Sequence, residues 1–167
     1  LVFVGNTTLP AKNVPEVVAY AKANPGKLSY ASYSAGTISH TMGLELNKAA
    51  GIDLNHVPYK GSPPALQDVM GGHVALMFDG PATSIPMIKG GKIKALAVSG
   101  PKRNPAMPEV PTFAEPGYPM LDDVAWMGLW IKPDVPADVQ AKIRQAALKV
   151  MTQPAVQTRL AELGNDL

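Results

Sequence analysis

At 167 residues the chain is long enough to bury one substantial core, and its 46% hydrophobic and 17% charged residues are typical of a globular protein. The net charge is only +2 and no basic tract alternates with aromatic residues, so we expect no nucleic-acid partner. The absence of Cys excludes disulfides, thiolate metal sites and Cys nucleophiles.

The first hundred residues alternate between strand and helix patterns. Asn13-Val-Pro-Glu16 is an N-capping signal that opens a helix, and Gly51 is placed to end a later one. Residues 74–78 form a continuous apolar run, which is typical of a strand buried in a parallel sheet. In chain order we expect strand 1–4, a helix from Asn13 to Asn24, strand 28–32, helix 37–50, strand 53–59, a short helix through Leu66 and Met70, strand 74–78, helix 84–89 and strand 93–98.

The rest of the chain begins with a Pro-rich surface excursion over residues 100–119. An apolar strand is expected at 124–131, then a helix from about Ala137 and a last helix that starts at Pro154. No apolar run approaches the ~20 residues that cross a bilayer, and the first residues lack the pattern of a signal peptide. We therefore expect a water-soluble chain of the α/β class, with an open, mostly parallel sheet flanked by helices.

The segment 28–40 is the most informative part of this pattern. It passes from a strand, through small hydroxyl residues around Gly36, into an amphipathic helix. Backbone N–H groups and hydroxyls thus gather at a helix N-terminus, where the dipole favours a negative charge. From the residues alone, a carboxylate and a phosphate suit this loop equally, and a well-capped turn without a ligand is the simpler alternative.

Ligands of open α/β sheets bind beyond the carboxyl ends of the strands, which here fall at 32–37, 59–62 and 79–84. Each candidate also has a structural interpretation. Thr37 is either an N-cap or a ligand donor, and the same choice applies to Ser34 and Ser39. Gly36 serves backbone geometry and close approach of a ligand alike.

His40 lies one helical turn after Gly36 and either faces the loop or packs. Lys60 supplies a cation where a carboxylate could dock, although a loop Lys is usually solvated. Asp79 either caps the following turn or binds a ligand group. His56 and His73 are expected at the opposite edge of the sheet, and their spacing predicts no metal site.

With these pieces placed, the chain resembles the substrate-binding proteins of the tripartite tricarboxylate transporter family, also called Bug-type extracytoplasmic solute receptors. The likeness covers essentially all 167 residues and depends on the order and spacing of several segments. These are Ala23-Asn-Pro-Gly-Lys-Leu-Ser-Tyr-Ala-Ser32, Gly36-Thr-Ile-Ser-His40, His56-Val-Pro-Tyr-Lys-Gly61 with Ala65-Leu66, Gly71-Gly-His-Val74 leading to Met77-Phe-Asp79, Lys92-Ile-Lys-Ala-Leu-Ala-Val98, and Pro108-Glu-Val-Pro-Thr112.

The resemblance implies one lobe of a two-lobed, type II periplasmic-binding-protein fold. Residues 1–4 correspond to the first hinge strand, 5–123 to the second, ligand-binding lobe, and 124–131 to the return hinge strand. Residues 132–167 resemble the C-terminal helices that pack on the first lobe, which the sequence does not contain. We expect self-association through the surfaces that this lobe covers in the family.

The function implied by the resemblance is capture of a small organic carboxylate, or a related polar metabolite, between two lobes in the periplasm. Delivery to the membrane transport subunits of the tripartite system follows, with no enzyme activity, catalytic residue, metal or cofactor. Carried over position by position, the ligand-binding residues are Ser34, Ala35, Gly36, Thr37, Ser39, His40, Tyr59, Lys60, Gly61 and Asp79. Tyr33 falls where the family is often rich in Ala and Gly, so it is expected to alter the pocket.

Two other classes of function are compatible with parts of the sequence. Ser34 or Ser39 with His40 and Asp79 could form a hydrolase site, but the chain has no Gly-x-Ser-x-Gly elbow and neighbouring helical residues point about 100° apart. A ligand-sensing domain of a regulator is the main alternative, because periplasmic-binding folds recur in such proteins. A helix-turn-helix region upstream would favour that alternative.

Overall fold

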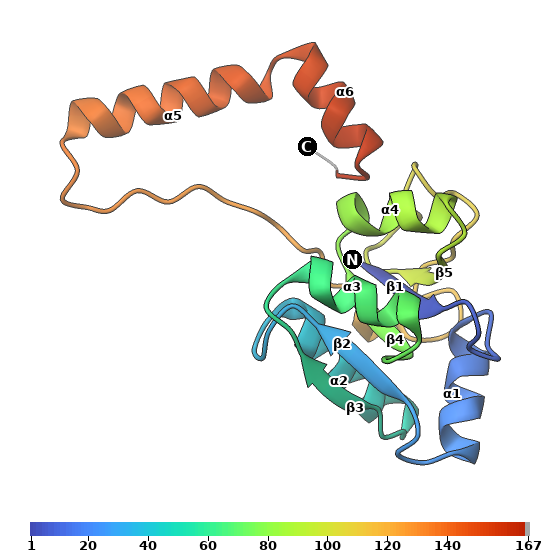
Figure 1. Ribbon diagram of the computed structural model, residues 1–167. Coiled ribbons are helices and arrows are strands. Elements are labelled where there is room, and N and C mark those ends of the chain that lie inside the picture. Colours follow the sequence, from blue (N-terminus) through green and yellow to red (C-terminus); the bar gives the residue numbers. More distant parts are fainter. Residues whose placement is uncertain (166–167) are drawn as a thin grey trace.

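The computed structural model describes residues 1–165 and contains a five-stranded sheet in the order β3-β2-β4-β1-β5 (Figure 1). Strands and helices alternate up to β5, as the sequence predicts. The elements are β1 Val2–Asn6, α1 Val14–Ala23, β2 Ser29–Ser32, α2 Ile38–Ala50, β3 Asn55–Pro58, α3 Ser62–Gly71, β4 Leu76–Asp79, α4 Pro81–Lys89, β5 Ile93–Val98, the 3-10 helix η1 Pro119–Leu121, α5 Ala137–Met151 and α6 Pro154–Glu162.

The strand directions place one set of chain ends together. β2 is parallel to both β3 and β4, with Ser32 opposite Pro58 and Ala31 opposite Met77. β1 lies between β4 and β5 and is antiparallel to both, so the other four strands run the same way. The carboxyl ends of β2, β3 and β4 therefore meet at one edge, and the predicted α/β fold with a mostly parallel sheet is confirmed.

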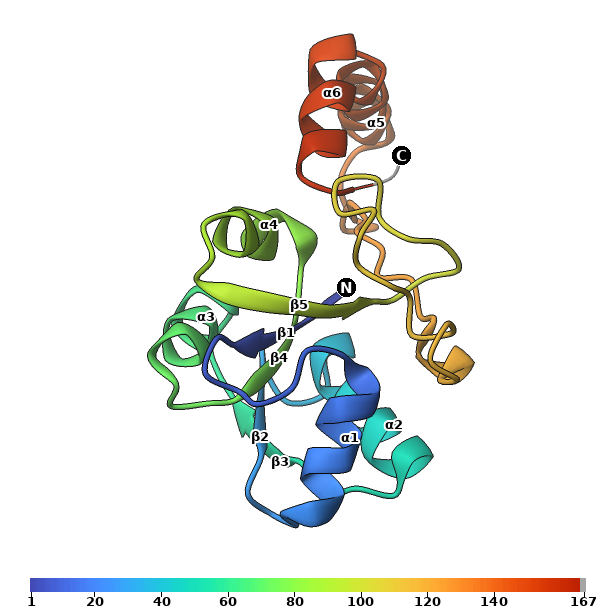
Figure 2. The ribbon, with the colours of Figure 1, turned by 90° about the vertical axis from the view of Figure 1, so that its right-hand side faces the viewer.

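Helices cover both faces of the sheet (Figure 2). One core cluster joins α1 and α2 to the sheet through Phe3, Tyr30 and Phe78, and the second joins α3 and α4 through Ala31 and Met77. Because successive side chains of a strand point to opposite faces, neighbours such as Tyr30 and Ala31 serve different clusters. Residues at the ends of the strands follow the same alternation, which fixes the face of the sheet on which each of them lies.

The helix boundaries have local causes that the sequence contains. Asn13 caps α1, since its Oδ1 accepts a hydrogen bond from the N–H of Glu16 at 2.9 Å. Glu16 in turn accepts from the side-chain amide of Asn13 at 2.9 Å and from the N–H of Lys12 at 2.8 Å, so the contact between Asn13 and Glu16 is reciprocal. α2 ends at Gly51 in the left-handed conformation, as predicted.

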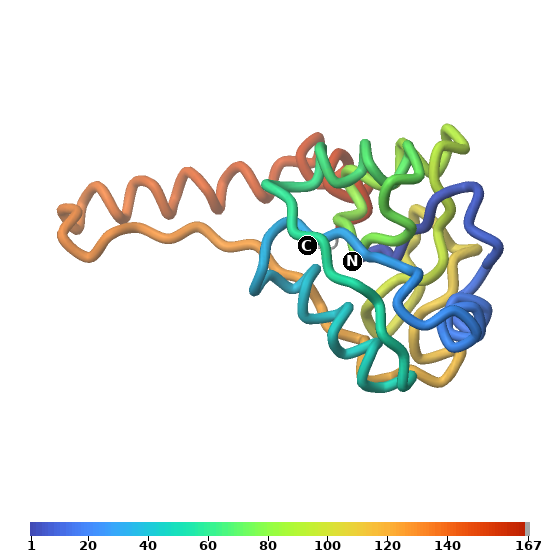
Figure 3. Tube along the Cα trace, turned by 60° about the horizontal axis from the view of Figure 1, so that its bottom comes forward, coloured from blue at the N-terminus to red at the C-terminus, as the bar shows by residue number. Residues whose placement is uncertain are grey.

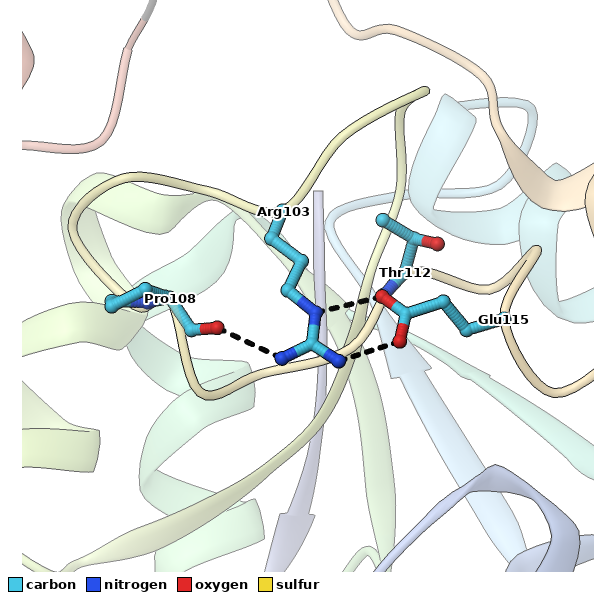
Figure 4. A network of polar contacts seen from close by, with 4 residues as sticks. All are labelled: Arg103, Pro108, Thr112 and Glu115. Carbon is cyan, nitrogen blue, oxygen red and sulfur yellow. Dashed lines mark hydrogen bonds and ion pairs between the residues drawn. The ribbon is translucent and has the colours of Figure 1, made fainter.

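An exposed ion pair fastens the Pro-rich excursion after β5 (Figure 4). The Arg103 guanidinium donates to both carboxylate oxygens of Glu115 and, at 3.0 Å, to the carbonyl of Pro108. Glu115 also accepts from the N–H of Thr112 at 3.1 Å. The hydrogen bonds from Arg103 are the main cause that lowers the pKa of Glu115 to about 2. The two-point geometry therefore links the beginning of the excursion to its later part.

The chain after η1 leaves the body of the molecule as an arm of extended backbone, α5 and α6 (Figures 1 and 3). Residues 124–131 form no strand ladder within the described range, and Trp126 and Trp130 are 75% and 73% exposed. A strand needs a neighbour with free backbone groups, and at the end of β5 the backbone of Val98 is already bonded to Pro111 and Phe113. The assignment of 124–131 as a return hinge strand therefore stays a prediction.

The two C-terminal helices contribute no buried residue to the cores. Only the end of α6 returns to the body, where Asn104 donates a 2.9 Å hydrogen bond to the carbonyl of Gly164. The packing of residues 132–167 on a first lobe stays a prediction, as does the hinge role of β1, and residues 166–167 lie outside the described range. Within that range no helix is long and apolar enough to span a membrane.

Candidate functional site

The carboxyl edge of the sheet brings together the three loops that the sequence singles out. The N–H of Tyr59 donates to the carbonyl of Ser32 at 3.0 Å, and the N–H of Gly61 donates to the carbonyl of Tyr33 at 2.9 Å. Asp79 ends β4 at the same level. The N-termini of α2, α3 and α4 start directly after these loops, so three positive helix ends converge here.

The loop before α2 leaves backbone donors without partners. The Thr37 hydroxyl donates to the carbonyl of Ser34 at 2.8 Å, so it does not cap the first turn of α2. Among residues 1–165 the N–H groups of Ile38 and Ser39 have no hydrogen-bond partner. Ser34, Ala35 and Gly36 are exposed. Such a turn suits an anion, because unpaired N–H groups and the helix dipole act together.

Ser39 and His40 are neighbours in the sequence but have unrelated partners. The Ser39 side chain is buried, and its hydroxyl donates to the carbonyl of Phe78 at 2.5 Å, which fastens α2 to β4. His40 is half-buried, and its Nδ1 accepts the N–H of Gly36 at 3.0 Å. The two side chains therefore do not form a nucleophile and its base.

A second histidine lies on His40, and the sequence analysis missed it. The rings of His40 and His56 stack with centroids 3.9 Å apart and an interplanar angle of 19°. His56 Nε2 lies 2.7 Å from Ser32 Oγ. Burial, and secondarily the neighbouring His40, lower the pKa of His56. The prediction that His56 lies at the opposite edge is wrong, because β3 is so short that its second residue already reaches the α2 N-terminus.

Asp79 is fully buried and surrounded by hydroxyl groups. Its Oδ1 accepts from Ser62 at 2.7 Å, and its Oδ2 accepts from Thr83 at 2.7 Å and from Ser84 at 2.5 Å. Burial, the charge of Asp79 and a hydrogen bond to it raise the pKa of Tyr33. The carboxylate thus joins the loop after β2 to the first turns of α3 and α4.

In the loop 59–61, the Tyr59 side chain is hydrogen-bonded to α3, whereas the Lys60 side chain is exposed to solvent. The Tyr59 hydroxyl donates to Asp68 Oδ2 at 2.6 Å on α3, and burial together with this contact raises the pKa of Tyr59 to about 12. Lys60 is exposed and has no ion pair in the described part of the chain. Gly61 has a φ of +108°, which a residue with a Cβ adopts only under strain. Lys60 is thus the candidate cation of this edge.

Two cavities in the described part of the chain lie elsewhere. One of about 390 Å³ lies beside β5 and is lined by residues that include Lys12, Lys94 and Glu109. The other, of about 610 Å³, lies between residues 129–131 and α5. Neither lining contains a predicted ligand residue. In the described range no three His, Asp or Glu side chains are grouped so as to hold a metal ion.

Relatives of the chain are found in several bacteria. A protein of Cupriavidus necator described as "UPF0065 protein in gbd 5'region" is 36% identical over 153 residues, which are 92% of this chain and 46% of that protein. The chain therefore spans about half the length of the curated relatives that it matches.

Solved structures share the fold. The periplasmic binding protein BugD is 34% identical with a TM-score of 0.93, over 98% of this chain and 55% of BugD. MatC from Rhodopseudomonas palustris, with bound malate, is 32% identical with a TM-score of 0.91, over 98% and 55%. R. palustris Rpa4515, with adipate, is 28% identical with a TM-score of 0.93, over the same shares.

The family comparison gives the same answer for the whole chain. Residues 1–167 match the tripartite tricarboxylate transporter family receptor, a class of solute-binding receptors rather than of enzymes. The resemblance expected from the segments in the sequence is thereby confirmed. The chain belongs to the tripartite tricarboxylate transporter receptor family of Bug-type solute-binding proteins.

Proposed function

We propose that this chain is the ligand-binding half of a periplasmic receptor, which captures a small organic dicarboxylate for delivery to the membrane subunits of a tripartite transporter. The observation that carries the proposal is the unpaired first turn of α2, with its N–H groups at Ile38 and Ser39 beside the exposed loop 34–36. Malate and adipate bound to two structural neighbours support a dicarboxylate as the ligand class.

Different predicted residues support the ligand in different ways. The backbone of residues 34–37, the His40 ring and the Lys60 ammonium group are the groups that we assign to direct contact. Ser39 and Asp79 already have buried partners, so we assign them to holding the helix N-termini in place. Tyr59, whose hydroxyl is bound to Asp68, contributes through its backbone.

The chain alone is expected to bind weakly. Its candidate donors lie at a sheet edge outside the two cavities described above, and the matched relative from Cupriavidus necator is about twice as long. Closure of a second lobe around the ligand would supply the remaining contacts and exclude water. Submicromolar binding of malate by the 167-residue chain would contradict this two-lobed mechanism.

Amide NMR with malate and adipate tests the proposal. We expect both dicarboxylates to shift the signals of residues 34–40 and 60–61, with a dissociation constant in the millimolar range. Replacing Lys60 with glutamine should weaken binding several-fold through loss of a charge-assisted contact. Lys92→Gln, at the exposed turn before β5, is the matched control. Absence of shifts at these residues, or equal effects of both variants, would overturn the site.

The arm is expected to drive self-association. Its extended part exposes large apolar side chains, with Met127 87% and Leu129 70% exposed, and burial of such surface is favourable. Light scattering over a concentration series should show a rising mass, and Trp126→Ser with Trp130→Ser should reduce it. A species that stays monomeric at high concentration would count against this surface as an interface.

A further inference from the structure

We propose that His40 and His56 act together as a unit that binds a single proton, and that capture of a carboxylate at the loop 34–37 takes up this proton. The choice of a carboxylate as the ligand rests on the proposed function. The uptake of a proton is argued from the contacts of the two histidine rings. His40 contacts the ligand in this assignment, and His56 is a positioning residue that acts through the His40 ring.

The hydrogen-bond network assigns a neutral ring to His40 and a hydrogen on Nε2 to His56. His40 Nδ1 accepts the N–H of Gly36, so it carries no hydrogen. The Ser32 hydroxyl donates to the carbonyl of Ser34 at 3.1 Å, which leaves its oxygen to accept a hydrogen from His56 Nε2. These tautomers follow from the partners of each nitrogen.

The stack disfavours two positive charges side by side. Two imidazolium rings with centroids 3.9 Å apart would repel each other, so a proton on one ring opposes a proton on the other. Within residues 1–165, the side chains of β2 that contact the pair are those of Tyr30 and Ser32, both uncharged, with the Tyr30 ring 5.1 Å from His56. Lys60, two residues after the end of β3, is the next charged residue along the chain.

Protonation of His40 changes what the loop offers to a ligand. Once Nδ1 carries a hydrogen it no longer accepts the Gly36 N–H, and this amide becomes free next to the unpaired amides of Ile38 and Ser39. The loop then combines three backbone donors with a cationic ring. A dicarboxylate favours this form, so its affinity rises as pH falls through the titration of the pair.

The proton unit is tested first without any ligand. In an NMR titration between about pH 5 and pH 8, the His40 ring and the Gly36 amide should shift with one midpoint, and the His56 ring should titrate at clearly lower pH. Replacing His40 with asparagine should raise the midpoint of His56, since a like charge is removed. Independent titration of the two rings, or a Gly36 amide that ignores His40, would overturn the inference.

Linkage to the ligand is tested second, by calorimetry with malate in buffers of different ionisation enthalpy. We expect uptake of up to one proton per malate, and above the midpoint a loss of affinity of about tenfold per pH unit. His40→Asn should remove this pH dependence. His56→Phe keeps an aromatic ring in the stack and should retain the pH dependence of malate affinity. His73→Asn, at the exposed end of α3, should leave both the affinity and its pH dependence unchanged.

The two parts of the experiment separate the possible failures. Malate binding that is independent of pH in the unchanged protein leaves the proposed function intact and overturns the proton linkage. No binding of malate or adipate at either end of the pH range counts against the proposed function, whereas the ring titration still decides whether the pair holds a single proton.

Discussion

Replacing Gly43 with alanine is expected to destabilise the protein by about 3 kcal/mol, because the core has no room for one extra methyl group at this position. A Cβ at Gly43 would lie 2.1 Å from Cε2 and 2.2 Å from Cζ of Tyr30. The Tyr30 ring is fully buried, and its hydroxyl donates to the carbonyl of His40, so it cannot turn away without losing that bond.

The same clash reaches the candidate site. Displacing α2 from Tyr30 moves His40 and the unpaired first turn, so the amide shifts that the ligand causes at residues 34–40 should become smaller as the protein becomes less stable. Chemical denaturation followed by circular dichroism measures the loss of stability.

Gly71→Ala is the matched control, since this helical glycine faces only the ring of exposed His73 at 3.1 Å. Alanine is a better helix former, so the control should be neutral or slightly stabilising. Equal stabilities of both variants would contradict the tight contact.

Replacing Asp79 with alanine is expected to cost about 3 kcal/mol of folding free energy, since three hydroxyl groups lose their shared acceptor. Ser62, Thr83 and Ser84 come from two helices, and, after burial, the charge of Asp79 also contributes to the raised pKa of Tyr33 in the loop after β2. Asp79→Asn keeps one acceptor oxygen and a similar shape, so it should lose less.

Thermal or chemical unfolding of both Asp79 variants measures this difference. Asp53→Ala is the control, because Asp53 is exposed and forms no hydrogen bond within residues 1–165. A small effect of Asp79→Ala would show that the hydroxyls find other acceptors. In that case Asp79 would be assigned to direct contact with the ligand. The Asp79→Ala variant would then lose the amide shifts caused by malate while it keeps its stability.

The local chemistry of the sequence was sufficient for the element order. The cap at Asn13, the end of α2 at Gly51 and the apolar run of β4 all lie where the sequence predicts them, because each depends on residues within a few positions. The grouping of the three loops at one edge followed from strand direction alone. By contrast, the strand pattern at 124–131 was misleading as local structure, because alternation identifies a suitable surface but not a partner for it.

The individual roles within the site depended on contacts between distant segments. Ser39 and His40 were equal candidates for ligand contact in the sequence. Only the structure shows that the Ser39 hydroxyl is already bonded to the Phe78 carbonyl and links α2 to β4. Tyr59 was expected among the ligand-binding residues, and only the packing of α3 placed Asp68 2.6 Å from its hydroxyl. The stack of His56 on His40 joins residues sixteen positions apart through the parallel register of β2 and β3.

The sequence by itself determined the fold class, the family and the edge of the sheet where the ligand site is proposed, because these follow from periodicity, turn residues and spaced motifs along the chain. The tertiary structure alone decided which side chains of that edge are free and which are engaged. A hydrogen bond or a ring contact depends on distances of a few ångströms between segments, and no local pattern fixes those distances. For this reason the sequence could suggest the first turn of α2 as an anion site, which stays a proposal, whereas it could not suggest the histidine pair beside it.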